Sequence, residues 1–273
     1  MNEHTHSVGE HAAEKAFSKQ ATIFDKLYSS NVIIQYKRQR VRDHVGQFIK
    51  PNSKILELNA GTGEDAIWFA QRGHDVHATD ISQGMQEKLV EKVKQSKLES
   101  KITHELCSFT ELKNLQNKGP YDLIFSNFAG LNCTGELDNV LHSFSSLLSN
   151  GGIVILVILP RFCLWEGMLF LRGEFKTAFR RFFSGKGVKA QIEGEVFTCW
   201  YYDPSYVIKA MQKSFDLLSL EGLCTLVPPS YLENFPKKRP RLYKWLKEQE
   251  DKLKSKWPWK AIGDYYIISL KKK

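Results

Sequence analysis

The sequence predicts an α/β fold in which a mostly parallel sheet is covered by helices on both faces. Strand-like and helix-like segments alternate from residue 54 to residue 159, as they do in chains of βαβ units. The segment 153–159 is apolar at every position, which is typical of a strand buried on both faces. With 273 residues, 42% hydrophobic and 25% charged, the chain has the size of one α/β domain with insertions.

The first fifty residues precede this alternation and are expected to divide into a tail and two helices. Residues 1–15 carry acids and histidines and are predicted to be a flexible N-terminal tail. Residues 16–50 place apolar residues at helical spacing on either side of a break at 29–31, whose sequence is Ser-Ser-Asn. Two cap helices are therefore predicted before the first strand.

The alternating region follows the periods of regular structure well enough to assign each element. Strands are predicted at 54–58, 75–79, 102–108, 121–127 and 153–159, and helices at 64–73, 82–96 and 136–152. A helix at 204–215, a short strand at 217–223 and a last strand at 264–270 complete the pattern.

Two segments interrupt the alternation and are predicted to be insertions with a function. Residues 161–202 are rich in aromatic and basic residues and are expected to form a helical lid. This lid would combine an apolar face with positive charge, through Phe162, Trp165, Met168, Arg180 and Arg181. It suits a substrate with an apolar body and an anionic group, although a core helix with a solvated basic face fits the same pattern.

The second insertion, residues 228–261, opens a strongly basic part of the chain. Residues 236–273 contain 13 Lys or Arg and 4 Asp or Glu, so the whole formal net charge of +9 lies there. Such a segment suits an anionic small molecule, an acidic carrier protein, a membrane surface or RNA. A solvated face that keeps the protein soluble fits equally well.

Composition disfavours several other classes of protein. The longest apolar stretch is too short to span a bilayer, so no transmembrane helix is expected, and only peripheral membrane contact is left open. The N-terminus lacks a secretion signal, and the five cysteines include no Cys-x-x-Cys pair. We therefore expect a cytoplasmic protein without a metal centre. A monomer and a homodimer are both compatible with the sequence.

The segment ILELNAGTGEDA, residues 55–66, predicts a ligand-binding turn between the first strand and the first helix. Gly61 and Gly63 allow positive φ and close approach of the backbone to a ligand. With Ala66 they also satisfy the G-x-G-x-x-A dinucleotide fingerprint. Glu57 separates the two interpretations, because its carboxylate would repel a diphosphate and suits a positively charged ligand such as the methionyl end of S-adenosylmethionine.

This segment, followed by GHDVHATDISQGM and YDLIFSNFAGLNC, resembles the class I S-adenosylmethionine-dependent methyltransferases, specifically their small-molecule or type 11 branch. The resemblance covers about residues 15–220, and GDYYIISL resembles the last, antiparallel strand of that fold. It implies a Rossmann-like seven-stranded sheet of order 3-2-1-4-5-7-6 within a single methyltransferase domain, residues 16–273. It also implies S-adenosyl-L-methionine as cofactor, S-adenosyl-L-homocysteine as product and a small-molecule substrate.

The resemblance assigns individual residues to the cofactor. Glu57, Gly61 and Gly63 would hold the methionyl end, and Asn59 stands where the family usually has glycine but tolerates left-handed φ. Asp80 would accept hydrogen bonds from both ribose hydroxyls. Taken singly, Glu57 could cap a helix and Asp80 could belong to a turn, but together they keep the spacing of the family.

Further positions complete the pocket that the resemblance implies. Ile81 and Met85 would flank the adenine, and Phe109 would pack on its ring. Ser108 stands where the family usually has an aspartate for the adenine amino group, and its hydroxyl would accept a weaker hydrogen bond. Tyr28, in the cap helices, would be a further contact with the cofactor.

Methyl transfer from a sulfonium is an in-line displacement that depends mainly on alignment. Asn127, at the end of the fourth strand, matches the motif position that faces the sulfonium and the substrate, although a loop asparagine bonding its own backbone fits as well. An acceptor that must lose a proton needs a base. The titratable candidates are His142, Glu166, Tyr201 and Tyr202, and their spacing identifies none of them.

Two alternatives to a small-molecule methyltransferase follow from the same sequence. An RNA methyltransferase would use the basic C-terminal segment, yet Ser126-Asn127-Phe128-Ala129 is not the [DN]PP[YF] motif of adenine N6 enzymes, and the Pro-Cys motif of cytosine C5 enzymes does not occur. A catalytically inactive, methyltransferase-like binding protein is suggested by Asn59 and Ser108, which depart from the family pattern.

Overall fold

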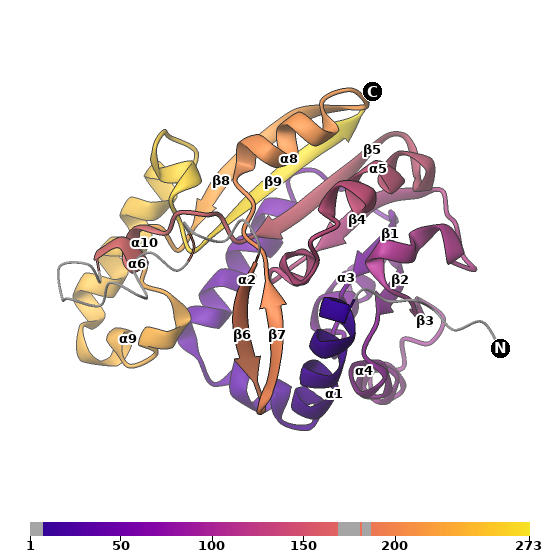
Figure 1. The fold of residues 1–273 in the computed structure, drawn as a ribbon, viewed down its shortest axis with the longest axis horizontal. Helices are drawn as coiled ribbons and strands as arrows, with labels where there is room; N and C mark the ends of the chain where they lie inside the picture. The colour runs from indigo at the N-terminus through magenta and orange to yellow at the C-terminus, as the bar shows by residue number, and fades with distance from the viewer. Residues whose placement is uncertain (1–7, 169–180, 182–186) are drawn as a thin grey trace.

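A twisted, mostly parallel sheet forms the centre of the molecule (Figure 1). The computed structural model describes residues 8–168, 181 and 187–273. Within these ranges, seven strands pair in the order β3-β2-β1-β4-β5-β9-β8, and β9 runs antiparallel to both of its neighbours. A separate hairpin takes the labels β6 and β7, so β8 and β9 occupy the places predicted for the sixth and seventh strands. The predicted fold class and strand order are confirmed.

The carboxyl ends of the parallel strands β1, β2 and β4 lie at the same edge of the sheet. Parallel pairing joins β1 to β2 on one side and to β4 on the other, with Leu56 opposite both His77 and Ile124. The strand bounds are β1 Lys54–Leu58, β2 Asp75–Asp80, β3 Ile102–Leu106, β4 Tyr121–Ser126, β5 Leu148–Ile158, β8 Phe215–Leu223 and β9 Tyr265–Lys272. In open α/β sheets this edge is where ligands bind.

Helices cover both faces of the sheet. On one face Val41, Phe69 and Leu89 are buried, and on the other Phe144 and Val207; burial of each such side chain contributes about 1.5–3 kcal/mol. The first layer comprises α2 (Val32–Val45), α3 (Glu64–Ala70) and α4 (Gln83–Gln95), and the second comprises α5 (Leu137–Leu147) and α8 (Pro204–Met211). Short 3-10 segments, η1 (Phe109–Asn114) and η2 (Gly130–Cys133), follow β3 and β4.

The first helix begins earlier than the sequence pattern predicted. α1 spans Val8–Ser29, so residues 8–15, predicted as part of a flexible tail, are helical, whereas residues 1–7 lie outside the described ranges. Ala13 and Ala16 are buried in one cluster with Phe197 and Cys199. These small side chains let the helix approach the hairpin closely, but they do not produce the apolar periodicity by which a helix is recognised.

The break between the cap helices lies where it was predicted. The Asn31 side chain accepts hydrogen bonds from the backbone N–H groups of Ile33 (3.0 Å) and Ile34 (3.2 Å), so it caps the N-terminus of α2. A boundary further along the chain differs: α5 ends at Leu147 although a helix was predicted to residue 152. Leu148 already pairs with Tyr121, which draws residues 148–152 into β5.

The first insertion is only partly helical. It contains the short α6 (Leu164–Met168) and an antiparallel hairpin made of β6 (Val188–Ile192) and β7 (Glu195–Cys199). Glu193 (φ 47°) and Gly194 (φ 81°) both have left-handed backbone, as a two-residue hairpin turn requires. The predicted helical lid is therefore wrong for residues 188–199, where a Glu-Gly turn between alternating residues should have indicated strands.

The second insertion packs as a small helical layer beside α2. It contains η5 (Ser230–Leu232), α9 (Phe235–Lys238), α10 (Pro240–Leu253) and η6 (Trp259–Ala261). Ile33, Val227 and Tyr243 form its apolar contact with the rest of the molecule. Among the described residues, none of the helices combines the length and the hydropathy needed to cross a bilayer.

Candidate active site

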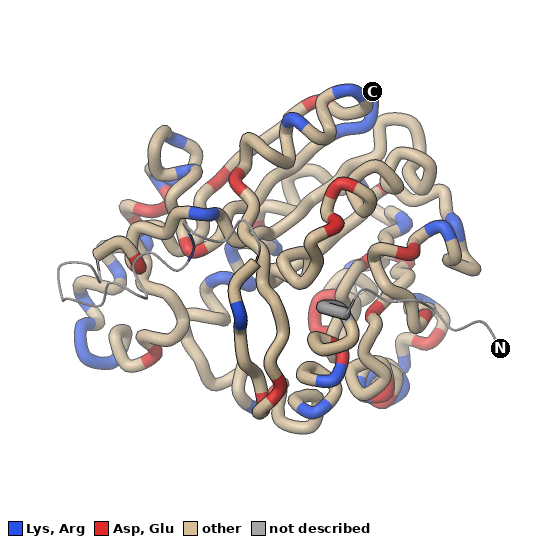
Figure 2. Tube along the Cα trace, viewed as in Figure 1, with Lys and Arg blue, Asp and Glu red and all other residues tan. Residues whose placement is uncertain are grey.

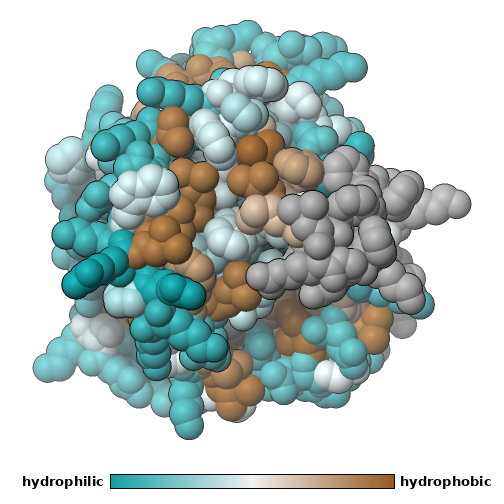
Figure 3. Space-filling view, turned by 90° about the vertical axis from the view of Figure 1, so that its left-hand side faces the viewer, coloured by the Kyte–Doolittle hydropathy of each residue, from teal (hydrophilic) through white to brown (hydrophobic). Residues whose placement is uncertain are grey.

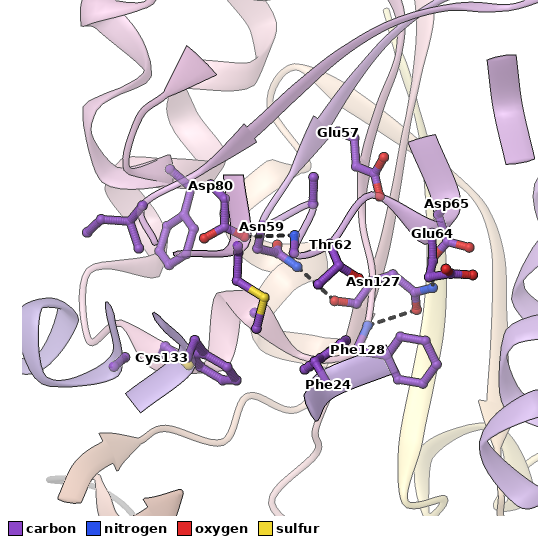
Figure 4. Close-up of a pocket in the computed structure, with 18 of the residues that line it drawn as sticks. Phe24, Glu57, Asn59, Thr62, Glu64, Asp65, Asp80, Asn127, Phe128 and Cys133 are labelled. Atoms are coloured by element: carbon purple, nitrogen blue, oxygen red, sulfur yellow. Dashed lines mark hydrogen bonds between the residues drawn. The ribbon is translucent and has the colours of Figure 1, made fainter. Parts of the chain in front are cut away.

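A pocket lies at the carboxyl ends of β1, β2 and β4, beneath α1 (Figure 4). The space that protein atoms leave free in it is about 910 Å³, part of which is open solvent. Almost all of the residues that the sequence assigned to the cofactor line it, namely Tyr28, Glu57, Asn59, Gly61, Asp80, Ile81, Met85, Ser108, Phe109 and Asn127. The structure therefore brings together residues from five separate segments of the chain.

The turn after β1 has the left-handed backbone that the sequence predicted. Asn59 has φ 47°, and its side chain is fixed by donating to the backbone oxygen of Asn127 (2.9 Å) and accepting from the Ser126 hydroxyl (2.6 Å). A Cβ atom at position 130 would collide with this side chain. Gly130 thus makes room for an asparagine at a position where the family usually has glycine.

The two glycines of the turn have different roles. Gly61 has φ 58° and no atom within 4 Å of the place where a Cβ would be, so its backbone is open to a ligand. Gly63 has φ 81° and begins α3; a Cβ there would lie 2.8 Å from Leu89 Cγ. Gly63 does not line the pocket and instead allows α3 and α4 to pack closely.

Asp80 is held in place by the backbone around it. One carboxylate oxygen accepts from Gly61 N (2.8 Å) and the other from Ser82 N (2.8 Å). Burial raises the pKa of Asp80, and these N–H groups act against the rise. Each oxygen retains a lone pair, so the carboxylate can accept two further hydrogen bonds from a diol.

Glu57 is the pocket acid that lacks a complete set of partners. Its side chain is 3% exposed, and its Oε2 atom has no hydrogen-bond partner among the described residues. Burial, and next the nearby charge of Asp65, raise the pKa of Glu57 well above its usual value, against the opposing effect of Arg38 and Arg42. A buried acceptor in this state fits a cationic, hydrogen-bond-donating group such as an ammonium.

Asp65 connects the pocket to α2 and was missed in the sequence. It accepts from Arg38 Nη1 (3.0 Å), Arg42 Nε (3.0 Å) and Asn127 Nδ2 (2.8 Å). Burial acts to raise the pKa of Asp65, but the two guanidinium groups outweigh it and the pKa is lowered. In the sequence Asp65 has the appearance of an ordinary acid in a first helical turn, and only the fold brings Arg38 to it.

The adenine end of the predicted site is mostly apolar. Met85 and Phe109 are buried there beside Ile81. Ser108 is also buried, but its hydroxyl caps η1 by accepting from Thr110 N (3.1 Å) and bonds the Thr110 hydroxyl (2.8 Å). The serine thus has a local structural role at the position where the family usually has aspartate.

Aromatic side chains from α1 and from the loop after β4 form the outer wall. The rings of Phe24 and Tyr28 stack with centroids 4.1 Å apart, and Phe17 also lines the pocket. Phe128, which also lines the pocket, lies under the Arg38 guanidinium at 4.9 Å. Phe17 and Phe24 were missed, although their spacing of seven and four residues along one helix face with Tyr28 could have indicated them.

The four predicted bases lie outside this pocket. His142 is exposed on α5, whose buried face is formed by neighbours such as Leu141 and Phe144. Tyr201 and Tyr202 are buried in the core, where Tyr202 donates to the backbone oxygen of Thr134 (2.6 Å). Both belong to buried apolar clusters, Tyr202 to that of Phe144 and Tyr201 to that of Phe197.

Glu166 belongs to a separate buried charge cluster. Its carboxylate accepts from Arg181 (2.7 Å), and Arg181 also bonds Asp264 (2.9 Å), which pairs in turn with Lys37 (2.7 Å). Cys163 lies close to both carboxylates. Two cations therefore balance two anions here, and Glu166 is a structural residue that joins α6 to the start of β9.

The described residues of the predicted substrate lid do not line the pocket. Arg181 is 4% exposed and its charge is neutralised internally, so it does not offer a site for a substrate anion. Trp165 packs edge-on against Phe235 with centroids 6.4 Å apart. Phe162 and Met168 also fail to line the pocket, and Arg180 lies outside the described residues. Among the described residues, α6 packs against the second insertion, and α1 lines the pocket; residues 169–180 and 182–186 of the predicted lid lie outside the described ranges.

Comparison with known proteins shows which proteins this fold resembles. A family model described as a methyltransferase domain matches residues 55–152. A search of curated proteins gave no match. Residues 55–152 therefore carry a methyltransferase domain, and the chain has the fold of the class I S-adenosylmethionine-dependent methyltransferases, as the sequence predicted.

Solved structures support the same fold at low sequence identity. An S-adenosylmethionine-dependent methyltransferase from Listeria monocytogenes has a TM-score of 0.58 and 15% identity, covering 85% of this chain and 96% of its own. The [4+2]-cyclase SpnF has a TM-score of 0.61 and 13% identity, with 95% of each chain covered. The 1,6-didemethyltoxoflavin-N1-methyltransferase of Burkholderia thailandensis has a TM-score of 0.57 and 12% identity, covering 100% of this chain and 93% of its own.

Proposed function

We propose that this chain transfers a methyl group from S-adenosyl-L-methionine to a small, apolar or aromatic acceptor. The observation that carries the proposal is the buried Oε2 atom of Glu57, which has no partner in the described residues. Four acids line the pocket, Glu57, Glu64, Asp65 and Asp80. Asp65 is paired with Arg38 and Arg42, and Glu64 with Lys92, which leaves Glu57 and Asp80 without a cation partner among the described residues. This excess of negative charge suits a cofactor with an ammonium and a sulfonium, and disfavours the diphosphate of a dinucleotide.

The residues of the pocket suit the parts of this cofactor in the order that the sequence predicted. Glu57 and the open backbone at Gly61 would hold the methionyl end, and Asp80 would hold the ribose hydroxyls through its remaining lone pairs. Ile81, Met85 and Phe109 would enclose the adenine. When bound, the cofactor supplies a methyl group on a positively charged sulfur that a nucleophile can displace in line.

The chain contributes to the transfer mainly by alignment and by exclusion of water. Asn127 keeps the loop after β4 in place through Asp65 and Asn59, so its own amide has a positioning role. Phe24, Tyr28 and Phe128 give the acceptor side of the pocket flat apolar walls. Since the four predicted bases lie elsewhere, we infer an acceptor that needs no dedicated protein base.

The walls of the pocket narrow the choice of acceptor. Solved structures of similar fold include the 1,6-didemethyltoxoflavin-N1-methyltransferase named above and a geranyl diphosphate C-methyltransferase from Streptomyces coelicolor A3(2). The described pocket residues offer stacking surfaces but no unpaired cation for a diphosphate, because Arg38 is paired with Asp65. We therefore favour a neutral aromatic acceptor over an anionic one and do not retain the anionic group that the sequence suggested.

A transfer assay with methyl-labelled S-adenosylmethionine tests this function. The acceptors would be neutral heteroaromatic bases, whose ring-nitrogen lone pair accepts a methyl group without loss of a proton, each with a carboxylated analogue, and bulk RNA. We expect label on neutral aromatics, and a Phe24→Ala variant should raise KM more than it lowers kcat. Preference for carboxylated analogues or RNA would contradict the proposed acceptor. Cofactor binding without transfer to any acceptor would favour a non-methylating role, which SpnF shows that this fold can host.

A further inference from the structure

A second feature of the molecule, unrelated to the pocket's chemistry, is a surface formed by the second insertion and the α1–α2 junction. Leu27, Val32, Tyr231, Leu242 and Trp245 are between 45% and 56% exposed there. The junction lies beside the insertion because Asn31 Nδ2 donates to the backbone oxygen of Ser230 (2.9 Å). Figure 3, which faces the side of the molecule where α9 and α10 lie, shows apolar side chains gathered among hydrophilic ones.

Positive charge surrounds these side chains. Residues 237–244 contain five basic side chains and no acid, namely Lys237, Lys238, Arg239, Arg241 and Lys244. All five are exposed, and none of them has an ion-pair partner among the described residues. Figure 2 shows this run of Lys and Arg along α9 and the start of α10. We call the five apolar and five basic residues together the basic-aromatic face.

The opposite side of α10 is firmly attached to the protein. Glu250 accepts backbone hydrogen bonds from Cys224 (2.8 Å), Leu226 (3.0 Å) and Val227 (2.8 Å). Tyr243 packs edge-on against Tyr36 of α2, with centroids 6.4 Å apart. Because this side supplies the packing, the exposed leucine and tryptophan are not needed to hold the helix, and they are presented on a rigid support.

We propose that the basic-aromatic face docks the protein peripherally on the surface of an anionic lipid bilayer. Tryptophan and tyrosine favour the headgroup region, leucine and valine gain from entering the acyl boundary, and lysine and arginine attract anionic lipids. Each kind of side chain on this face therefore has a favourable environment at such an interface.

The composition of the face argues against other partners. A nucleic acid would satisfy the five cations but would leave Leu27, Val32 and Leu242 without an apolar environment. A second copy of the chain meeting the same face would bring ten cations together, against which residues 230–245 of each copy offer one acid, Glu233, since a two-fold contact is self-complementary. The anionic bilayer is the partner that accounts for both the charge and the exposed aliphatic residues.

Docking in this orientation would bring the wall of the pocket close to the lipid. Leu27 belongs to the basic-aromatic face, while Phe24 and Tyr28 of the same helix line the pocket. The docking proposal does not depend on the proposed methyl transfer, and binding to lipid can be measured without cofactor or acceptor.

Flotation with vesicles tests the proposal on the full chain. Vesicles of equal phosphatidylglycerol and phosphatidylcholine would be compared with phosphatidylcholine alone, and Trp fluorescence would be recorded in parallel. We expect binding to the anionic vesicles, weakened by salt, with a blue shift that is reduced in Trp245→Phe. Lys237→Glu with Lys238→Glu should lower the partition coefficient at least about tenfold, and Leu242→Ser with Trp245→Ser should also lower it.

A matched control uses exposed lysines elsewhere. Lys94→Glu with Lys113→Glu changes the net charge equally but lies on α4 and η1, and it should leave binding within about twofold of the parent. Thermal melts would show that all variants fold. Absence of binding at low salt, or an equal loss in the control pair, would overturn the proposal. Two further results would overturn it if Trp245→Ser left lipid binding unchanged. Retention of bulk RNA by the face would favour RNA as the partner, and a dimer that Trp245→Ser dissociates would favour a second copy of the chain.

Discussion

Asn127 Nδ2 donates to Asp65 Oδ2 at 2.8 Å, and this bond joins the loop after β4 to the first turn of α3. The same carboxylate binds Arg38 and Arg42 of α2. Three segments around the pocket thus share one buried anion. The pocket's geometry, and the charge that Glu57 experiences, both depend on this arrangement.

Asp65→Asn should destabilise the protein by about 3–5 kcal/mol, because it leaves two guanidinium groups without their anion. The lowered pKa of Asp65 also predicts a pH dependence. Its contribution to stability is present above the ordinary aspartate pKa, about 4, and is lost as pH falls through the lowered value. Urea unfolding from neutral pH down to about pH 3 should show a larger loss in the parent than in Asp65→Asn, because Asp264 and Glu221, whose pKa values are also lowered, are present in both.

Asp43, exposed on α2, provides the control for that experiment. Asp43→Asn should change the free energy of unfolding by no more than about 0.5 kcal/mol. If Asp65→Asn were equally mild, the buried network would not be what organises this side of the pocket.

Asp80→Asn should weaken binding of S-adenosylhomocysteine by about ten- to a hundredfold. The amide can replace only one of the two acceptors that now bind Gly61 N and Ser82 N, and it offers a ribose fewer lone pairs. Asp75→Asn is the matched change at the exposed end of the same strand and should have no effect. Calorimetry of the three proteins checks this, and unchanged affinity in Asp80→Asn would remove the ribose assignment.

The raised pKa of Glu57 leads us to expect that cofactor binding releases a proton. Burial and the charge of Asp65 raise its pKa, and a bound ammonium would favour the ionised form, so affinity should increase as pH rises from the ordinary glutamate range toward the raised pKa. Calorimetry in buffers of different ionisation enthalpy measures the proton released. Glu57→Gln should bind at least about tenfold more weakly and lose this component of the pH dependence. A parent protein that releases no proton would contradict the role of Glu57.

The two glycines of the turn should respond differently to alanine. Gly63→Ala meets Leu89 and should lower the free energy of unfolding by about 1–3 kcal/mol. Gly61→Ala has open space, so it should cost only about 1 kcal/mol of backbone strain but weaken cofactor binding more than Gly63→Ala does. Thermal melts and calorimetry on both variants separate the effects, and the reverse pattern would show that the roles are exchanged.

The sequence predicted the parts of the fold that repeat a simple period. The parallel strands and the glycine turn follow from local patterns, and the strand order followed from the family resemblance. The helical residues 8–15 were missed because Ala13 and Ala16 pack by being small, which leaves little apolar pattern. The hairpin at 188–199 was missed because its surroundings were interpreted as one helical insertion.

In the site, too, residues close together in the sequence were predicted, whereas contacts between distant residues were not. Glu57, Asn59 and Gly61 lie within one short segment and were identified together. Arg38 and Asp65 are 27 residues apart, and their pairing depends on how α2 crosses α3, which no local pattern encodes. His142 and Glu166 were proposed as bases from chemistry alone, and burial and packing, which depend on the fold, exclude them from the pocket.

The most direct test of the account is calorimetry of the parent protein with S-adenosylhomocysteine and, separately, with NADH. The acid-lined pocket predicts that S-adenosylhomocysteine binds at a single site and that NADH, which brings a diphosphate to Glu57, does not bind. Binding of NADH without binding of S-adenosylhomocysteine would contradict the central claim.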